Sequence, residues 1–410
     1  MASALTDPER AMAPDKRKPL ALHVAVPTED DSYPVLVGPG LLGRLGHELR
    51  RSHPKASRVA LISDTNVMPL YGQAARESLE AQDLEVHSFT VPAGEATKCT
   101  ERLFELIDGM VAARMGRRDV VVALGGGVVG DLAGLAAALF MRGISLMQCP
   151  TSLLAQVDAS VGGKVAIDLP SGKNLVGAFH FPTVVLIDPE VLSTLPDREL
   201  SCGLAEMLKH GALFSPEHFC QVVAASDDIY ARDTDVLARM VATSVGLKAA
   251  CVSRDPREQG EAGKGRVVLN LGHTVGHVLE MLSDFELKHG EAVALGLVAM
   301  ARLSQRKQIA PTPPAGAGGA GAGAGVAEAG EQGLEDQLRQ ALAALRLPTN
   351  LDEWLEDERA SRMESVLAND KKRAGSSISF IALKAIGSPA VLSLTAAEIV
   401  SLLRDPDGDC

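Results

Sequence analysis

The chain has 410 residues, of which 46% are hydrophobic and 22% charged, and its formal net charge at pH 7 is −12. This length allows two domains with separate hydrophobic cores, and the acidic balance argues against a nucleic-acid partner held by bulk positive charge. The six cysteines form no C-x-x-C pair, which indicates reduced thiols and an intracellular protein. No run of eighteen apolar residues occurs, so the sequence predicts no membrane span.

The first half of the chain alternates short β-rich runs with helical patterns, after a polar stretch at residues 1–20 that we expect to be a disordered extension. Helical patterns at residues 73–82 and 100–115 lie between the runs. Strands that alternate with helices predict an α/β domain with a largely parallel sheet, which we place at residues 21–195. The predicted strands are ALHVAV, YPVLVG, RVALISD, LEVHSFTV, DVVVALGG, SLMQCP and TVVLID.

From residue 196 onward strand signals nearly vanish, and long helical patterns such as residues 235–253 and 290–306 dominate. We therefore expect a mostly helical second domain at residues 196–405. Within it, residues 311–333 (PTPPAGAGGAGAGAGVAEAGEQG) are of low complexity and predict a flexible insertion. Near the end, SISFIALKAIGSPAVLSL predicts a short hairpin.

A predicted strand leads into three glycines and then a helix at residues 119–134, DVVVALGGGVVGDLAG. Backbone N–H groups at such a turn can approach a phosphate, and a helix N-terminus favours negative charge. The alternative is a tight strand–helix turn without a ligand, because the G-x-G-x-x-G spacing is absent. Asp64 ends one strand and could accept ribose hydroxyls, and Glu95 and Lys98 follow another. Ligands of open α/β sheets bind at these strand ends, which favours a nucleotide site.

The segment at residues 150–180 is rich in polar side chains that lie among glycines, namely Asp158, Lys164, Lys173 and Asn174. Glycines allow backbone shapes that could bring these side chains into a cleft. The alternative is an ordinary solvated loop.

Three histidines, His273, His277 and His289, lie within 17 residues. Upstream, Glu206 and Lys209 share one helix face at i, i+3 spacing, which alone would indicate a surface ion pair. A glutamate with histidines and one open position suits catalytic zinc. The i, i+4 spacing favours His273 and His277 as the metal pair, but spacing does not decide which two of the three bind. The alternative is histidines satisfied within a helical core.

In this order, GGGVVGDLAG, FMRG, PTSLLAQVDASVGGK, GKNLVGAFH, GLAEMLKHG, LNLGHTVGH and HGEAVALG resemble the 3-dehydroquinate synthases, which belong to the sugar phosphate cyclase family. The resemblance extends from about residue 20 to 400, apart from the low-complexity insertion. It implies an α/β N-terminal NAD-binding domain plus a mostly α-helical C-terminal metal-binding domain.

The resemblance also implies a phosphate lyase that converts 3-deoxy-D-arabino-heptulosonate 7-phosphate to 3-dehydroquinate and phosphate. The steps would be transient oxidation by NAD, phosphate elimination, re-reduction and intramolecular aldol closure, in the second step of the shikimate pathway to chorismate and the aromatic amino acids. The expected cofactors are NAD and a divalent metal, zinc or cobalt. Family members are commonly cytoplasmic homodimers, and no nucleic-acid or membrane partner is expected.

Site residues follow from the resemblance position by position. The implied metal ligands are Glu206, His273 and His289, which leaves His277 as a proton-transfer residue. The implied catalytic residues are His277, Glu258, Lys164 and Asn174. The implied cofactor site contains Asp64, Asn66, Glu95, Lys98, Gly126, Gly127, Val128, Asp131, Thr151, Ser152, Lys173 and Thr194. The implied substrate site contains Asp158, Lys164, Asn174, Lys209, Lys248, Arg266, Asn270, His277 and Lys371, with Arg142 reaching the phosphate bound by a partner subunit.

Several alternatives stay open at this stage. Lys372 competes with Lys371, and the long connection QGEAGKG makes Glu261 a substitute for Glu258. A cyclase acting on sedoheptulose 7-phosphate, a metal-dependent alcohol or glycerol dehydrogenase, and a catalytically inactive homologue are the rival functions. The retained Asn174, Lys248 and Arg266 argue against the first two.

Overall fold

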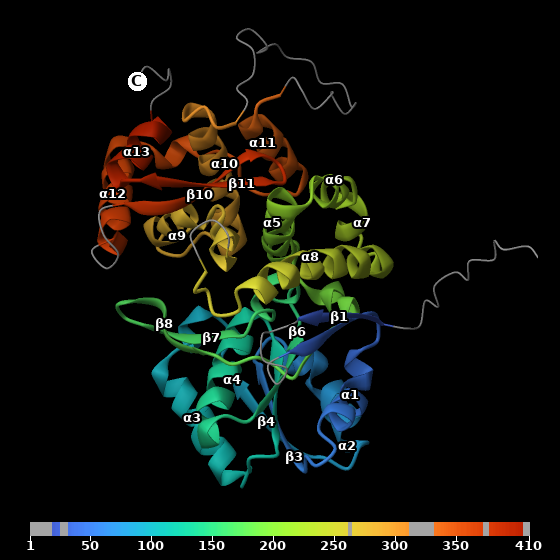
Figure 1. Ribbon diagram of the computed structural model, residues 1–410. Coiled ribbons are helices and arrows are strands. Elements are labelled where there is room, and N and C mark those ends of the chain that lie inside the picture. The colour runs from blue at the N-terminus through green and yellow to red at the C-terminus, as the bar shows by residue number, and fades with distance from the viewer. Residues whose placement is uncertain (1–18, 25–31, 261–264, 311–331, 372–376, 405–410) are drawn as a thin grey trace, which may run out of the picture.

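The chain folds into a half built on a β-sheet and a half built of helices, as the computed structural model in Figure 1 shows. The structure describes residues 19–24, 32–260, 265–310, 332–371 and 377–404. Residues 1–18 of the predicted extension and 311–331 of the predicted insertion lie outside this set. The predicted combination of an α/β N-terminal half with a helical C-terminal half is confirmed.

The N-terminal half is organised by a seven-stranded sheet in the order β1-β2-β9-β6-β5-β3-β4. β1 pairs antiparallel with β2, and every other neighbouring pair is parallel. All seven predicted strands are present in this sheet, with ends within two residues of those expected. Their bounds are β1 (Leu20–Val24), β2 (Tyr33–Val37), β3 (Arg58–Asp64), β4 (Glu85–Val91), β5 (Val120–Gly125), β6 (Ser145–Pro150) and β9 (Val184–Ile187).

Helices cover both faces of the sheet, so its central strands are buried on both sides. On β3, Val59 and Leu61 face one core together with α1 (Leu45–Ser52) and α2 (Gln73–Glu80). Ala60 and Ile62 face the opposite core with α3 (Thr100–Ala112) and α4 (Gly127–Leu139). This two-sided burial explains why these strands are continuous apolar runs.

A separate two-stranded hairpin, β7 (Lys164–Leu169) and β8 (Gly172–Phe179), crosses α4 at the side of the sheet. Neither strand was predicted, because β8 exposes most of its side chains and contains two glycines. The polar segment at residues 150–180 therefore contains a helical turn (Ala155–Ala159) followed by this hairpin, rather than being one solvated loop.

The C-terminal half is mostly helical and ends in a second hairpin, which confirms the strand pair predicted near the end of the chain. Its elements are α5 (Asp197–Phe214), α6 (Pro216–Ala224), α7 (Ser226–Tyr230), α8 (Thr234–Arg254), α9 (His273–Leu282), α10 (His289–Arg306), α11 (Leu334–Ala344), α12 (Asp357–Lys371), β10 (Ile378–Ala385), β11 (Ser388–Leu394) and α13 (Ala396–Arg404).

One hydrophobic core joins the two halves, because it contains Val35 of β2 and Val185 of β9 together with Leu208 of α5 and Val245 of α8. Among the described residues, α8 is the one helix long and apolar enough to cross a membrane by length and composition. It packs against β1 and α5 inside this core, which is how a central helix of a folded domain behaves. We propose that a domain boundary lies between β9 and α5, near residue 196.

Candidate active site

Three helices of the C-terminal half meet at close range and bring together residues that are far apart in the sequence. Glu206 lies in α5, His273 is the first residue of α9, and His289 is the first residue of α10. Glycines make this approach possible: a Cβ on Gly296 of α10 would overlap the carbonyl oxygen of Gly272, and a Cβ on Gly290 would overlap the backbone of α5. The helix crossings therefore require glycine where they build the site.

Glu206 is completely buried, and one of its carboxylate oxygens faces two imidazoles. Oε1 lies 3.6 Å from Nε2 of His273 and 3.5 Å from Nε2 of His289, distances too long for hydrogen bonds. Oε2 of Glu206 contacts the Lys209 ammonium, whereas Oε1 accepts no hydrogen bond from the residues that the structure describes. A buried carboxylate oxygen without a hydrogen bond is costly, which marks this position as one that a ligand completes.

The orientation of the His273 ring shows what kind of ligand fits. Its Nδ1 lies 3.1 Å from the carbonyl oxygen of Leu271, and a carbonyl only accepts, so Nδ1 carries the proton. Nε2 of His273 consequently presents a lone pair toward the Glu206 carboxylate. The ligand atoms of Glu206, His273 and His289 all lie within 4.8 Å of one another. One carboxylate and two imidazole nitrogens form a donor set that suits zinc or cobalt.

Charges around Glu206 keep it ionised. Burial would raise the pKa of Glu206, but the adjacent Lys209 ammonium and the two histidines outweigh this and hold the pKa well below its usual value. Burial would likewise lower the pKa of His289, whereas Glu206 and Glu280 on either side of its ring raise it to about 10. A proton on His289 thus compensates the carboxylates in the metal-free protein.

His277 lies one helical turn beyond His273 and is exposed where the other two imidazoles are partly covered. Its ring centroid is 5.1 Å from that of His273 and 6.1 Å from that of His289. Although the ring reaches the surface, the protein packed around it and the neighbouring His289 lower the pKa of His277. The ring is therefore neutral near pH 7 and able to accept a proton.

A second group of charged side chains lies beside the histidines at the junction of the two halves. The Lys248 ammonium donates to the Asp158 carboxylate at 2.6 Å, and burial lowers the pKa of Lys248 to about 8. The buried Arg266 guanidinium donates to the carbonyl oxygens of Gly162 at 2.8 Å and Pro256 at 3.1 Å. These contacts fix two cations of the helical half against the segment that joins β6 to β7.

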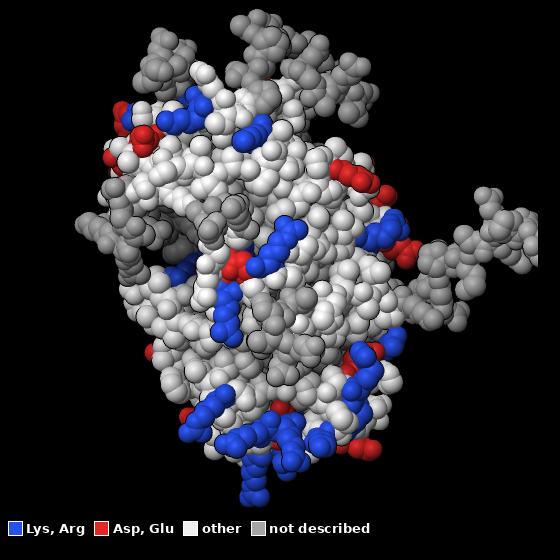
Figure 2. All heavy atoms as spheres, in the orientation of Figure 1, with Lys and Arg blue, Asp and Glu red and all other residues white. Residues whose placement is uncertain are grey.

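Lys164 and Glu258 also meet across this junction, in direct contact and nearer to solvent. Glu258 has a left-handed backbone (φ 54°). Asn270 ends a short 3₁₀ helix, η8 (Arg266–Asn270), directly before the histidine helix α9. An opening between the two halves is visible at the left of Figure 2, with basic side chains at its rim.

The predicted cofactor residues lie at the carboxyl ends of the parallel strands. Asp64 ends β3, and Gly126 and Gly127 follow β5. From β3 the chain continues to β4 on one side, whereas from β5 it continues to β6 on the other, so the strand order reverses between β3 and β5. Such a reversal point is where open α/β sheets bind nucleotides. Gly127 also begins α4, whose N-terminus favours a phosphate there.

Lys98 connects the two parts of the site. Its ammonium donates to Asp131 of α4 at 2.9 Å and to the side-chain oxygen of Asn174 in β8 at 2.5 Å, and Glu95 lies 3.5 Å away. Burial raises the pKa of Asp131 to about 6, although Lys98 opposes this rise. A predicted cofactor residue thus holds a predicted substrate residue in place.

The remaining predicted cofactor residues border the same edge of the sheet. The Thr151 backbone donates to the carbonyl oxygen of Gly125 at 2.9 Å, and Ser152 follows it. The hydroxyl of Thr194 lies 2.7 Å from that of Tyr71. Asp64 caps the turn after β3 by accepting from the backbone of Asn66 at 2.8 Å. Val128 is the second residue of α4.

Of two further predicted residues, Lys173 contacts the helical half and Arg142 lies apart from the site. Lys173 of β8 lies over the ring of Phe285, 4.6 Å from its centroid, in the turn between α9 and α10. Arg142 is exposed at the end of a short 3₁₀ helix, η5 (Phe140–Arg142), with φ 68°. None of the described polar contacts joins Arg142 to the cluster. The Lys371 side chain, Lys372 and Glu261 lie outside the described residues.

Sequence reasoning missed several residues that touch this site. Glu280 contacts His289, Asp168 accepts from the Asn174 backbone at 2.7 Å, and His210 lies 3.8 Å from Asp158. A signal existed for Glu280, since it follows His273 by seven residues and His277 by three, and so shares their helix face. Asp168 and His210 depend on contacts between elements, for which the sequence has no local signal.

Comparisons with known proteins agree with this arrangement. Residues 88–202 match the family described as 3-dehydroquinate synthase N-terminal, and residues 203–317 match its C-terminal counterpart. The chain is 46% identical to a 3-dehydroquinate synthase of Symbiobacterium thermophilum, over 84% of this chain and 88% of that protein. It is 42% identical to one of Lactiplantibacillus plantarum, over 85% and 89%.

Among solved structures, a similar one is the 2-epi-5-epi-valiolone synthase of Streptomyces hygroscopicus with NAD+ and Zn2+ bound. Its TM-score is 0.76 and its identity 26%, over 90% of this chain and 95% of that one.

Proposed function

Because this chain belongs to the 3-dehydroquinate synthase family, we propose that it converts 3-deoxy-D-arabino-heptulosonate 7-phosphate to 3-dehydroquinate and phosphate. It is a phosphate lyase of aromatic amino acid biosynthesis that uses NAD and a divalent metal, zinc or cobalt. The single observation that carries the proposal is the buried Glu206 carboxylate, whose Oε1 lacks a hydrogen bond and faces two imidazole nitrogens beside a group of cations.

We propose that Glu206, His273 and His289 hold the metal. When bound there, the metal supplies Lewis-acid polarisation of a substrate hydroxyl. The unpaired Oε1 of Glu206 and the lone pair on His273 Nε2 fit such an ion. The Lys209 ammonium touches the second Glu206 oxygen and leaves the first one free for the metal.

NAD, when bound at the reversal point between β3 and β5, supplies a hydride acceptor that is regenerated within each turnover. The residues at the strand ends would orient it: the N-terminus of α4 would hold the pyrophosphate, and Asp64 at the end of β3 and Lys98 beside α4 would hold other parts of the cofactor. Lys98 holds Asn174 of the hairpin, so the cofactor and substrate parts of the site are positioned together.

The substrate is an anion with a phosphate and a carboxylate, and the junction supplies cations for both groups. Lys164, Lys248 and Arg266 come from different elements and face the same region. Arg266 is fixed by two carbonyl oxygens, so it is preorganised for a planar anionic group. His277, neutral at pH 7, accepts or returns protons at the mouth of the site, and Glu258 beside Lys164 is a second acceptor.

We further propose that the enzyme works in the cytoplasm as a homodimer. Arg142 is exposed and apart from the cluster, which suits a residue that reaches the phosphate bound by a second copy. The scattered free cysteines suit a reducing compartment.

Product identification tests the proposed function. Purified protein is incubated with the seven-carbon keto-acid phosphate, NAD and zinc, and both phosphate release and dehydroquinate are measured. We expect equal amounts of the two products and no net NADH. Sedoheptulose 7-phosphate and simple alcohols are the matched controls for the two rival functions, and turnover of either of these in place of the keto acid would reject the proposal.

A further inference from the structure

The carboxylate of Glu280 contacts the metal-site histidine His289 on the side of the ring that faces away from Glu206. Glu280 is in α9, seven residues after His273, and its side chain is 7% exposed. Its Oε1 lies 3.3 Å from Nδ1 of His289, in hydrogen-bonding geometry. The mechanism above uses neither this carboxylate nor this contact.

The contact fixes which nitrogen of His289 carries the proton. An ionised carboxylate only accepts, so Nδ1 of His289 donates and carries the N–H. Once Nε2 loses its proton, as metal binding requires, its lone pair faces Glu206 Oε1, 3.5 Å away. The Leu271 carbonyl does the same for His273 from the opposite direction. Both imidazoles are thereby set in the tautomer and orientation that a cation at Glu206 requires.

The two orienting groups differ in charge, and this difference gives Glu280 a separate role. Leu271 offers a neutral carbonyl, whereas Glu280 offers a negative charge that makes the imidazole a stronger donor to a metal. The backbone around Glu280 is also well anchored, because its carbonyl oxygen accepts from the Ser283 hydroxyl at 2.8 Å and from the Phe285 backbone at 2.9 Å. The carboxylate is therefore held in place before any ligand arrives.

We propose that Glu280 is a positioning residue that orients His289 and strengthens its bond to the divalent metal, without itself contacting the metal. The inference rests on the proposed function, since it takes Glu206, His273 and His289 as the ligands. Loss of a partner of this kind typically weakens metal binding 10- to 100-fold.

The test compares zinc and cobalt binding by full-length protein that has been stripped of metal and reloaded. Glu280→Gln keeps the shape and an acceptor oxygen but removes the charge, and Glu280→Leu removes both. We expect the zinc Kd, measured by competition with a chelator, to rise about 10- to 100-fold in Glu280→Gln and further in Glu280→Leu. Phosphate release lost at limiting zinc should recover in Glu280→Gln at excess zinc.

Glu291→Gln is the matched control. Glu291 lies two residues from His289 and is also a partly buried acid, but it pairs with Arg198 at 2.6 Å and caps the Lys288 backbone at 2.9 Å. Glu291→Gln removes the same charge as Glu280→Gln but changes no contact to the His289 ring. The zinc Kd of this variant should therefore stay within about twofold of wild type. If lost negative charge near α10 were the whole cause, the zinc Kd would rise equally in both variants, and this result would overturn the proposal.

The visible spectrum of the cobalt-loaded protein separates positioning from ligation. At saturating cobalt, the bands of Glu280→Gln should match those of wild type, because the set of ligands is unchanged. Altered bands would show that Glu280 is itself a ligand. A zinc Kd of Glu280→Gln within twofold of wild type would show that Glu280 does not contribute to metal binding. Either result overturns the inference. If His273→Ala binds zinc as tightly as wild type, the ligand set of the proposed function fails instead.

Discussion

Helix α10 has a cluster of charged residues at each end, and the two clusters differ in how far their charges are satisfied. At the N-terminal end, His289 faces Glu206, whose buried Oε1 accepts no hydrogen bond from any described residue. At the C-terminal end, Arg302 makes hydrogen bonds or ion pairs through all three of its guanidinium nitrogens. One helix thus contributes to a cluster that needs a ligand and to one that is complete.

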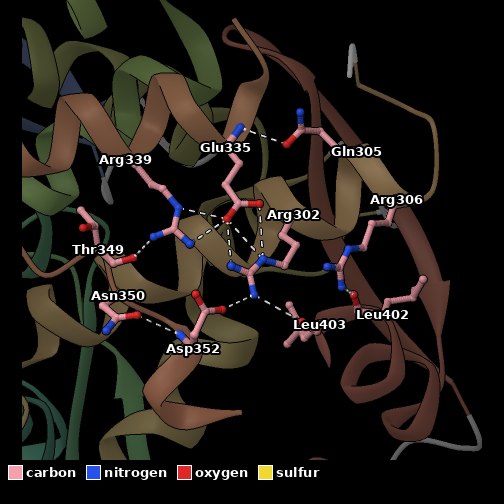
Figure 3. A network of polar contacts seen from close by, with 10 residues as sticks. All are labelled: Arg302, Gln305, Arg306, Glu335, Arg339, Thr349, Asn350, Asp352, Leu402 and Leu403. Carbon is pink, nitrogen blue, oxygen red and sulfur yellow. Dashed lines mark hydrogen bonds and ion pairs between the residues drawn. The ribbon is translucent and has the colours of Figure 1, made fainter. Parts of the chain in front are cut away.

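The Arg302 cluster ties together the elements around the end of α10, as Figure 3 shows. The Arg302 guanidinium donates to Glu335 of α11 at 3.0 Å and to Asp352 at 2.7 Å. Glu335 also accepts from Arg339 at 2.7 Å. Arg302 and Arg306 both contact carbonyl oxygens in the last turn of α13. We interpret this cluster as a structural connection among α10, α11 and α13.

The comparison shows that an open cavity is a poor guide to the active site here. A cavity of about 590 Å³ lies beside the Arg302 cluster, lined by Arg302, Arg306, Glu335 and Asp352. Both acids of this lining are paired with Arg302, so a ligand that binds Arg302 would have to break existing ion pairs. Around Glu206 the unsatisfied groups are the signal, because a buried polar atom without a partner is expensive unless something binds it.

The largest effect is expected at the unsatisfied end. His273→Ala removes one of three metal donors, and both the metal and the activity should be lost, with zinc affinity reduced by more than about 1000-fold. Metal content after dialysis and phosphate release measure the two effects. A variant that keeps as much metal as wild type would refute the ligand assignment.

His277→Ala should separate chemistry from metal binding. The ring lies near the cluster but outside the group formed by Glu206, His273 and His289. We expect full metal content and a kcat about 100- to 10,000-fold lower, the usual contribution of a general acid or base. Metal loss together with the fall in kcat would show instead that His277 is a ligand.

Arg302→Leu tests the satisfied end. The side chains of Arg302 and Glu335 are only 11% and 19% exposed, so removal of the cation leaves Glu335 with less compensation in a poorly solvated place. We expect the free energy of unfolding to fall by about 2–4 kcal/mol, with zinc affinity unchanged. Arg102→Ala, which breaks an exposed pair with Glu105, is the control and should leave the free energy of unfolding nearly unchanged. Denaturant titration measures the free energy of unfolding of both variants. A changed zinc Kd in Arg302→Leu would contradict the claim that the two clusters are independent.

The smallest effect concerns a buried histidine that belongs to neither cluster. Burial lowers the pKa of His218 to about 4, and neither ring nitrogen has a hydrogen-bond partner among the described residues. The unfolded chain therefore binds more protons than the folded chain between about pH 4 and 6.5. Stability should fall as the pH drops through this window, by up to about 3 kcal/mol.

His218→Leu should flatten this part of the stability profile. Unfolding by denaturant at several pH values compares the variant with wild type, and the difference between their slopes isolates the one histidine. Identical slopes would mean that His218 keeps its ordinary pKa in the folded protein.

Much of the fold could be predicted from the sequence, for a physical reason. Strands buried on both faces need apolar side chains at every position, so runs such as RVALISD and DVVVALGG are recognisable. The β7–β8 hairpin could not be found in this way. β8 exposes Lys173, Asn174 and Leu175, and so lacks both an apolar run and a clean alternation.

The candidate site was only partly predictable without the family resemblance. Spacing within one helix favoured His273 and His277 as the metal pair, since these residues share a helix face. The structure groups His273 with Glu206 and His289, which lie on two other helices, and it also groups His277 with Glu280 and His289. That grouping depends on how closely α5, α9 and α10 cross. Glycines permit this crossing, but a glycine in the sequence does not indicate which helix will pack against it.

The most direct test is anomalous diffraction at the zinc edge from crystals of the zinc-loaded enzyme. The account predicts one strong peak bound by an oxygen of Glu206 and by Nε2 of both His273 and His289, at about 2.0–2.2 Å from each. It also predicts no second peak beside Arg302. A peak bound by His277 in place of His289, or no peak near Glu206, would contradict the account.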